Sequence, residues 1–510
     1  MSRGTCLVGI DIGTSACKLV AFSENGQALT SRTVTYQTQY PQPGYVEQNP
    51  DDWWEAVIRG IREMLAEGVV SASEIAAIGI DGQGWSAIAM DAQGNVLAPD
   101  PIWLDTRAES ICEELHARIG KDAIFALSGN PLKAQYVTAK ILWLQRHLPQ
   151  AYAKTKWIMQ SNGFIAYRLT GSVSMDISQA YGLHCFDMKN GHMDDAMCRT
   201  LGIDRRLIPD IVPCHAVIGC VSENAARQTG LLAGTPVVAG GLDAACSTLG
   251  AGVLHAGQTQ EQGGQAGGMS ICIDQYCADA RLILGYHVVP NHWLLQGGTT
   301  GGGGAMRWFE REFADFERRM AIEKGGSSFV FLDALAETVS AGSDGVVFLP
   351  YLAGERSPIW DNDAQGVFFG LDYSKTRAHM VRALMEGVAY SLRHNLEIAE
   401  SVGAQIKTLR ATGGSANSRL WTQIKADCTG KDIEVPESDL ATPLGAAILA
   451  GVGVGVYPDF DDAVSRTVTI KRCQKHDDAN RGAYDAGYEI YRTLYEQLKN
   501  VMKQNRRAGA

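Results

Sequence analysis

The first residues that could do chemistry lie in the stretch GIDIGTSACKLVAF, residues 9–22. Asp11 stands between two isoleucines, so in a strand its carboxylate would point away from the apolar side chains. The turn Gly13-Thr14-Ser15 follows, and it offers backbone N–H groups and hydroxyls beside a carboxylate that can hold Mg²⁺. This is the outline of a phosphate site, and an ordinary hairpin with a polar tip is the alternative.

Three further glycine-rich turns occur at residues 240–243, 297–304 and 413–418. Glycine lets the backbone approach a polyanion closely, so several such turns in one chain favour a nucleotide ligand. The turn GGTTGGGGAMRWF leads into a predicted helix that carries Arg307. The stretch ATGGSANSRLW predicts a strand, two glycines and a helix start suited to an adenosine phosphate or a ribose edge.

Asp243 lies at the predicted start of a helix of small residues, AGGLDAACSTLGAG. Two compatible interpretations are open. As a helix N-cap, its carboxylate would accept a hydrogen bond from a backbone N–H group. As a general base, it would accept the proton of an attacking hydroxyl.

Two loops, PIWLDTRA at residues 101–108 and LPYLAGERSPIWD at residues 349–361, place Trp, Asp, Glu and Arg next to one another. Loops of this composition more often bind a ligand than merely connect two elements. Salt-bridged connecting loops are the alternative.

Strands and helices must bring these residues together. Residues 1–100 predict strands with glycine turns and then a helix, NPDDWWEAVIRGIREML, which Asn49 caps and Pro50 begins. Residues 110–215 predict mostly helix. The pattern of strand, glycine turn and small-residue helix then returns at residues 235–252.

A second strand, turn and strand unit begins at residues 258–273 and echoes the opening hairpin. The echo suggests an internal duplication, with the site between the two halves and a boundary near residues 253–260. The chain ends in a predicted helix with one apolar seam, made of Tyr484, Tyr488, Tyr491, Tyr495, Leu498 and Met502.

The composition limits the class of protein. A chain of 510 residues exceeds what one hydrophobic core usually serves, so two large domains are expected. A net charge of -11 without a Lys/Arg stripe argues against nucleic-acid and anionic-membrane partners. Twelve scattered cysteines without metal spacing predict free thiols in a reducing cytoplasm. The start MSRGTCLVGI has too short an apolar run for a secretory signal, and no stretch predicts a membrane span.

The order and spacing of several stretches resemble the FGGY carbohydrate kinases, and most of all their xylulokinase branch, over roughly residues 5–460. The stretches are GIDIGTSACKLV, GYVEQNPDDWW, PIWLDTR, VVAGGLDAACSTLGAG, LPYLAGERSP, GVFFGL and TGGSANSRLWTQIKADCTG. The resemblance implies an α/β protein of two actin-like ATPase (ribonuclease-H-like) domains with ATP and sugar in the cleft between them. The sugar side, the first phosphate loop and the catalytic aspartate would lie in residues 1–255, and the adenine nucleotide side in residues 256–460. A helical segment over residues 461–510 would pack on the second domain.

The resemblance also implies roles for single residues. Asp243 would be the catalytic base, and Asp11 would serve Mg²⁺. The residues implied for the nucleotide are Gly13, Thr14, Ser15, Lys18, Gln265, Gly303, Arg307, Gly414 and Ser418. The residues implied for the sugar are Gln83, Gly84, Trp85, Trp103, Arg107 and Asp243.

The chain departs from the family pattern at two places. Where xylulokinases usually have Gln-Met-His, it has Gln83, Gly84 and Trp85, so a bulky indole replaces a hydrogen-bonding ring. This change implies that the sugar can differ from D-xylulose. Where the second phosphate loop usually has Gly-Thr-Ser, the chain has GGQAG, with Gln265 in place of threonine.

We therefore expect a cytoplasmic, ATP- and Mg²⁺-dependent kinase that phosphorylates a primary hydroxyl of a pentulose or similar open-chain sugar. A related polyol, hexulose or sugar-acid kinase is the alternative within the class. A sugar- and nucleotide-binding regulator without catalysis is another alternative, which Gln265 permits. An actin-like ATPase with a protein partner is the third, and the sugar-side pattern weighs against it. Dimers occur in the family, which leaves a homodimer open.

Overall fold

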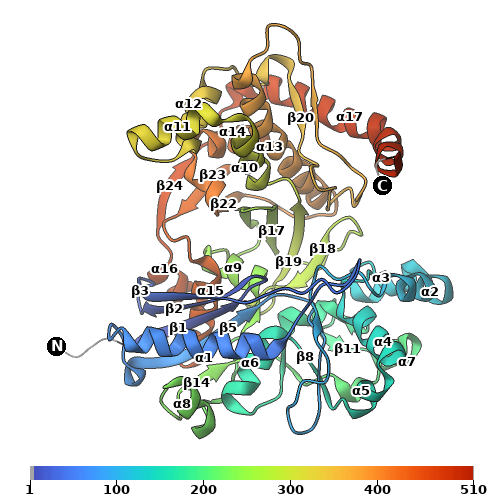
Figure 1. The fold of residues 1–510 in the computed structure, drawn as a ribbon, viewed down its shortest axis with the longest axis vertical. Coiled ribbons are helices and arrows are strands. Elements are labelled where there is room, and N and C mark those ends of the chain that lie inside the picture. The colour runs from blue at the N-terminus through green and yellow to red at the C-terminus, as the bar shows by residue number, and fades with distance from the viewer. Residues whose placement is uncertain (1–4, 509–510) are drawn as a thin grey trace.

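The computed structural model describes residues 5–508. Residues 1–4, which belong to the stretch considered above for a secretory signal, lie outside this range. The protein consists of two α/β halves stacked along its long axis, each built on a seven-stranded sheet (Figure 1). The sheet strands β17, β18 and β19 of the second half face the first half across the middle of the molecule (Figure 1). None of the helices within residues 5–508 is both long and apolar enough to cross a membrane.

The first sheet has the strand order β13-β14-β5-β1-β2-β3, and β15 pairs with β5 beyond this path. β1 pairs with β2 as an antiparallel hairpin and with β5 in parallel. Its strands are β1 (Cys6–Ile12), β2 (Ala16–Ser23), β3 (Ala28–Thr35), β5 (Ile75–Gly82), β13 (Val217–Cys220), β14 (Pro236–Val238) and β15 (Gly241–Leu242).

The second sheet has the order β18-β19-β17-β16-β22-β23-β24. Its hairpin β16–β17 and the parallel neighbour β22 repeat the arrangement of β1, β2 and β5. This repeated topology agrees with the duplication that the sequence suggests. Its strands are β16 (Gln258–Gly263), β17 (Gly267–Ile273), β18 (Ile283–Tyr286), β19 (Trp293–Thr299), β22 (Thr408–Thr412), β23 (Asp432–Pro436) and β24 (Ile470–Gln474).

Helix α1 (Pro50–Ala66) begins as predicted, because the Asn49 side chain accepts the N–H group of Asp51 at 3.2 Å. Its apolar positions recur every four residues and pack on β2 and β3, which buries Trp53 and Val57 completely. The other helices of this half are α2 (Glu109–Ile119), α3 (Lys121–Ser128), α4 (Val137–His147), α5 (Pro149–Lys154), α6 (Ser161–Thr170), α7 (Asp195–Leu201), α8 (Glu223–Thr229) and α9 (Asp243–Gly250).

The closing helix α17 (Arg481–Ala508) buries the predicted tyrosine seam against the second half. Tyr491 is 1% exposed, and its hydroxyl accepts a hydrogen bond from that of Tyr351 at 2.6 Å. The seam therefore docks the end of the chain, as predicted. The other helices over the second sheet are α10 (Gly303–Phe313), α11 (Asp315–Lys324), α12 (Ser328–Glu337), α13 (Arg377–Ser401) and α14 (Arg419–Thr429).

Helix α15 (Ala441–Gly453) follows the second sheet in sequence but packs on β1 and β5 of the first. A Cβ atom on Gly9 or Gly79 would lie 1.9 Å from a backbone oxygen of this helix, so only glycine permits the approach. Helix α16 (Phe460–Thr467) packs beside α15. Helix α15 thus packs on the first sheet although it lies within the range 256–460 that is expected for the second domain.

Short elements complete the fold and connect the loops of the site. They include β4 (Glu47–Gln48), β6 (Ile88–Met90), β7 (Asp100–Pro101), β8 (Trp157–Met159), β9 (Met175–Asp176), β10 (Phe186–Asp187), β11 (His192–Met193), β12 (Ile211–Val212), β20 (Val347–Leu349), β21 (Val367–Phe369) and the 3-10 turns Ile177–Gly182 and Gly414–Asn417. All twelve cysteines are free thiols, as predicted.

Candidate active site

Two cavities, each of about 410 Å³, share Gly264 in their walls. The first lies between the two halves. Its walls include Thr14, Gly84, Trp85, Trp103, Tyr181 and Asp243 from the first half and Gln260, Gln265, Ile283 and Arg356 from the second. The second cavity belongs to the second half, and its walls include Gly303, Met306, Arg307, Phe329, Asp333, Gly414, Ser418 and Trp421.

Three carboxyl groups gather at one edge of the first sheet. Asp11, the next-to-last residue of β1, lies directly opposite Asp81 of the parallel strand β5. The short strand β15 pairs with Asp81 and Gly82, and Asp243 follows it. Because the carboxyl ends of parallel strands meet at one edge of a sheet, residues far apart in sequence lie together here.

Burial controls the charge of this carboxyl cluster, Asp11, Asp81 and Asp243. It raises the pKa of Asp11 to about 6. Burial, with the charge of Asp11, raises the pKa of Asp243 to about 7. Asp81 is completely buried, and burial beside the other two carboxylates raises its pKa well above the ordinary value. A bound cation would offset these shifts by stabilising the ionised forms.

The donor set at this edge fits Mg²⁺. No group of three His, Cys, Asp or Glu side chains within residues 5–508 is arranged to hold a metal by itself. Mg²⁺ does not need one, since it commonly takes one or two carboxylates and completes its octahedron with water and substrate phosphates. The Asp11 carboxylate lies against the phosphate turn, with Oδ1 3.7 Å from where a Cβ on Gly13 would stand.

Asp243 is the first residue of α9, and Leu242 takes the N-cap position. Its Oδ1 accepts the N–H group of Ala244 at 2.6 Å, so the carboxylate is fixed at the positive end of the helix. The N-cap interpretation is therefore wrong, although the residue does satisfy one free N–H group of the first turn. The same side chain lines the first cavity, where a ligand hydroxyl can reach it.

The turn after β1 is held from outside. Tyr36 donates its hydroxyl to the Gly13 carbonyl, and Gln48 Nε2 donates to the Thr14 carbonyl at 2.6 Å. Thr14 also lines the first cavity. Ser15 and Lys18 lie outside the walls of both cavities, and Lys18 pairs with Asp11 across the hairpin.

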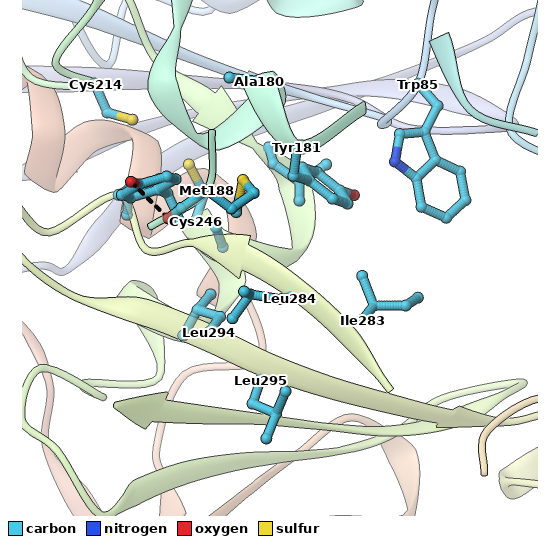
Figure 2. Close-up of a cluster of buried hydrophobic side chains, with 14 of the residues drawn as sticks. Trp85, Ala180, Tyr181, Met188, Cys214, Cys246, Ile283, Leu284, Leu294 and Leu295 are labelled. Carbon is cyan, nitrogen blue, oxygen red and sulfur yellow. Dashed lines mark hydrogen bonds between the residues drawn. The ribbon is translucent and has the colours of Figure 1, made fainter. Parts of the chain in front are cut away.

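Aromatic rings form one wall of the first cavity, on the side where the resemblance implies the sugar. Trp85 packs on Tyr136 with ring centroids 4.4 Å apart and on Tyr181 at 5.8 Å. Figure 2 shows the Trp85 and Tyr181 rings side by side, facing Ile283 of the second half. Trp85 has φ 63°, a left-handed backbone conformation that is uncommon for a bulky residue and often marks a functional site.

Two residues that the resemblance implies for the sugar lie behind this wall. Gln83 is 1% exposed, and its amide donates to Gln48 Oε1 at 2.8 Å. Arg107 forms ion pairs with Glu47 at 2.7 Å and Asp105 at 2.8 Å. Both side chains bind other residues of the protein, and neither lines the first cavity. Their place argues for supporting the site rather than touching the ligand.

Sequence analysis missed several wall residues. Arg356 is the arginine of the loop LPYLAGERSPIWD, which the sequence predicts to bind a ligand, but the resemblance gave it no role. Its guanidinium lies 5.8 Å from the Trp103 ring centroid. Tyr181 lies in a 3-10 turn and carries no signal in the sequence. Asp333 is the acidic residue in the wall of the second cavity, and burial raises its pKa.

Gln265, within the second turn that the resemblance implies for phosphate, makes two hydrogen bonds. Its carbonyl accepts the N–H group of Gly304 at 2.9 Å, and its Oε1 accepts Nη2 of Arg307 at 2.5 Å. Beneath it, the buried pair of Lys425 and Glu261 (2.7 Å) also binds the Ser415 hydroxyl at 2.8 Å. Gln265 thus joins its turn to the start of α10, and Lys425 joins the preceding strand β16 to the turn at Ser415.

Family models match both halves of the chain. The FGGY family of carbohydrate kinases matches with its N-terminal domain over residues 6–250 and its C-terminal domain over residues 275–454. The chain belongs to this family. It is a carbohydrate kinase with two actin-like ATPase domains, as the resemblance implied, and kinases of the family use ATP.

Relatives of two activities are about equally similar. The chain is 30% identical to a xylulose kinase of Staphylococcus epidermidis over 97% of each chain. It is 31% identical to a gluconokinase of Bacillus subtilis over 98% of this chain and 97% of the relative. Among solved structures, it is similar to xylulose kinase from Rhodospirillum rubrum, with a TM-score of 0.88, 30% identity and coverage of 98% and 100% of the two chains. It is also similar to gluconate kinase from Lactobacillus acidophilus, with a TM-score of 0.87, 25% identity and coverage of 97% of this chain and 98% of the other.

Proposed function

We propose that this FGGY kinase transfers the γ-phosphoryl group of ATP to a primary hydroxyl of a pentulose or similar open-chain sugar. The observation that carries the proposal is the position of Asp243, in the wall of a cavity between the two halves that adjoins a second cavity at Gly264. An acceptor bound in the first cavity and a nucleotide bound in the second would meet there.

Asp243 would act as the general base. Its carboxylate would accept the proton of the sugar hydroxyl as that oxygen attacks the γ-phosphorus. Burial raises the pKa of Asp243, so its carboxylate accepts a proton more readily than an exposed aspartate does. The N–H group of Ala244 fixes one of its oxygens, so the carboxylate keeps its direction.

The other residues would bind and orient. Thr14 and the backbone of the turns at Gly13 and Gln265 would hold phosphate oxygens, with Arg307 beside them. Asp11 would hold Mg²⁺, which would neutralise charge on the phosphate oxygens. Gly303, Gly414 and Ser418 would border the nucleoside in the second cavity.

The walls around Trp85 and Trp103 would enclose the sugar. Their rings cover the side of the cavity that belongs to the first half, and excluding water there limits hydrolysis of ATP. The intact carboxyl cluster and the ordered Gln265 turn favour a working kinase over a regulator that has lost catalysis. The homodimer and the cytoplasmic location stay predictions.

A sugar acid is the second candidate substrate. Among the described residues, Arg356 is the one basic side chain in the wall of the first cavity. Its guanidinium offers donors that match a carboxylate in a bidentate geometry. Gluconokinases are also among the relatives at similar identity.

The test is ADP formation across a panel of pentuloses, hexuloses, polyols and sugar acids. We expect ADP release only when a suitable sugar is present, with D-xylulose-like ketoses or D-gluconate-like acids ranked by kcat/KM. Equal ATP consumption without any sugar would indicate an ATPase. Sugar and nucleotide binding without turnover would indicate a regulator.

A further inference from the structure

The ammonium group of Lys140 lies in the core of the first half, behind the aromatic wall of the first cavity. The residue belongs to α4 and is 1% exposed. Its Nζ donates to the Trp85 carbonyl at 2.6 Å and to the Ile102 carbonyl at 3.0 Å. One side chain therefore joins the two loops that carry Trp85 and Trp103.

Both loops accept a hydrogen bond from Lys140, a donor outside either loop. The backbone of Trp85 is in the left-handed conformation, which is unfavourable for a residue with a bulky side chain. The Lys140 ammonium, which donates to the Trp85 carbonyl from outside the loop, helps to hold this conformation. Trp103 follows Ile102 directly, and its indole N–H donates to Thr14 Oγ1 at 2.9 Å. The order imposed by Lys140 thus extends to the first phosphate turn.

Two buried carboxylates complete the arrangement. Asp100 Oδ1 accepts the N–H group of Ala87 at 2.7 Å, and Asp105 Oδ2 accepts that of Val46 at 2.7 Å. Both aspartates are completely buried, and both favour the charged form of Lys140. Burial nevertheless lowers the pKa of Lys140 to about 8. Burying this ammonium thus costs free energy of desolvation, and its two hydrogen bonds go to the loops that carry Trp85 and Trp103.

We propose that Lys140 is the positioning residue of the sugar side: it sets the separation of the Trp85 and Trp103 loops, and so the width of the cavity, without touching the substrate. The proposal takes from the proposed function only that the first cavity admits the sugar. A side chain that merely stabilises the core would change stability without changing sugar binding in the folded protein.

The test compares Lys140→Met with a matched control, Arg382→Met. Arg382 is also a buried cation, 7% exposed, but it pairs with Glu386 at 2.8 Å in the second half. We expect Lys140→Met to lower kcat/KM by about 10- to 100-fold, mainly through the KM for D-xylulose or D-gluconate, whichever the wild type uses better. The KM for ATP should stay within about twofold. Arg382→Met should leave the sugar KM unchanged.

Hydrogen exchange gives a second readout that needs no activity. In Lys140→Met the amides of residues 83–87 and 100–105 should exchange faster than in the wild type, and in Arg382→Met they should not. Lys140→Arg should recover most of the protection, because a third cavity of about 200 Å³ beside Lys140 gives the larger side chain room. If Lys140→Met does not fold, Lys140→Gln takes its place.

Unchanged exchange of both loops, or a sugar KM that Lys140→Met and Arg382→Met alter equally, would overturn the proposal. If the wild type phosphorylates no sugar, the proposed function fails, and the exchange measurement still decides the role of Lys140 in ordering the loops.

Discussion

The carboxylate of Asp11 is the single group on which the magnesium hypothesis depends most. Replacing it by Ala should raise the Mg²⁺ concentration needed for half-maximal turnover and lower the turnover itself, because one metal ligand is lost. The sugar KM should change little, since Asp11 lies outside the wall of the first cavity. Titration of activity with Mg²⁺ measures this. An Asp11→Ala protein with the wild-type Mg²⁺ dependence would make Asp11 a structural residue of the hairpin.

Trp85 stands at the position where the resemblance to the xylulokinases implies a histidine. Its indole offers one N–H donor and an apolar face, whereas histidine can both donate and accept. A sugar hydroxyl left unpaired costs about 1–3 kcal/mol, so Trp85→His should shift the ranking of sugars toward D-xylulose. Histidine also tolerates the left-handed backbone better than most residues, so the swap adds little strain.

Relative kcat/KM over the sugar panel measures this effect of Trp85. A wild type that already prefers D-xylulose, or a ranking that the swap leaves unchanged, would show that Trp85 does not contact the sugar. Its rings would then serve packing against Tyr136 and Tyr181.

Single residues were predictable where their neighbours in sequence determine their place. Asp11 and Thr14 follow directly from a strand and its turn, and Asp243 from a strand and a helix start. The roles implied for Gln83 and Arg107 were less secure because their partners, Gln48 and Glu47, lie far away in sequence. No local pattern indicates such pairs.

At the scale of elements, Glu355 connects the loop after β20 to the end of β19. Its carboxylate accepts the Thr299 hydroxyl at 2.6 Å and the N–H group of Thr300 at 2.9 Å. Burial raises its pKa to about 7. The folded protein therefore binds a proton between the ordinary pKa and 7 that the unfolded chain does not bind. The protonated Glu355 therefore adds to the free energy of unfolding. This contribution is fully present below the ordinary glutamate pKa and is lost as the pH rises through about 7.

We expect Glu355→Gln to remove that pH dependence. Between about pH 5 and pH 8 the wild type should lose about 1–3 kcal/mol of unfolding free energy relative to the variant. Urea unfolding at several pH values measures it. Parallel stability curves for the two proteins would contradict the role given to Glu355.

Elements with a local signal were predicted well, and those fixed by distant packing were not. The hairpin at residues 258–273, α1 and the seam of α17 appear where the sequence places them. The return of α15 to the first sheet was missed, because it depends on the contact of Gly9 and Gly79 with a helix more than half the chain away.

At the scale of the whole molecule, the duplication creates the site. Each half supplies one glycine turn at the end of its first strand, and the two turns, at Gly13 and Gln265, come from equivalent hairpins. The first cavity takes its walls from both halves, so neither half alone encloses a sugar. Closure of the two halves around the ligands would complete the site and exclude water.

The central claim is that Asp243 is the base of a sugar-dependent phosphoryl transfer, and turnover of Asp243→Asn tests it most directly. Asn accepts a hydrogen bond from the helix N–H group about as well as Asp, so the melting temperature and the binding of sugar and nucleotide should be kept. Sugar-dependent ADP formation should fall by about two to four orders of magnitude, the usual contribution of a general base. Turnover close to that of the wild type would contradict the account.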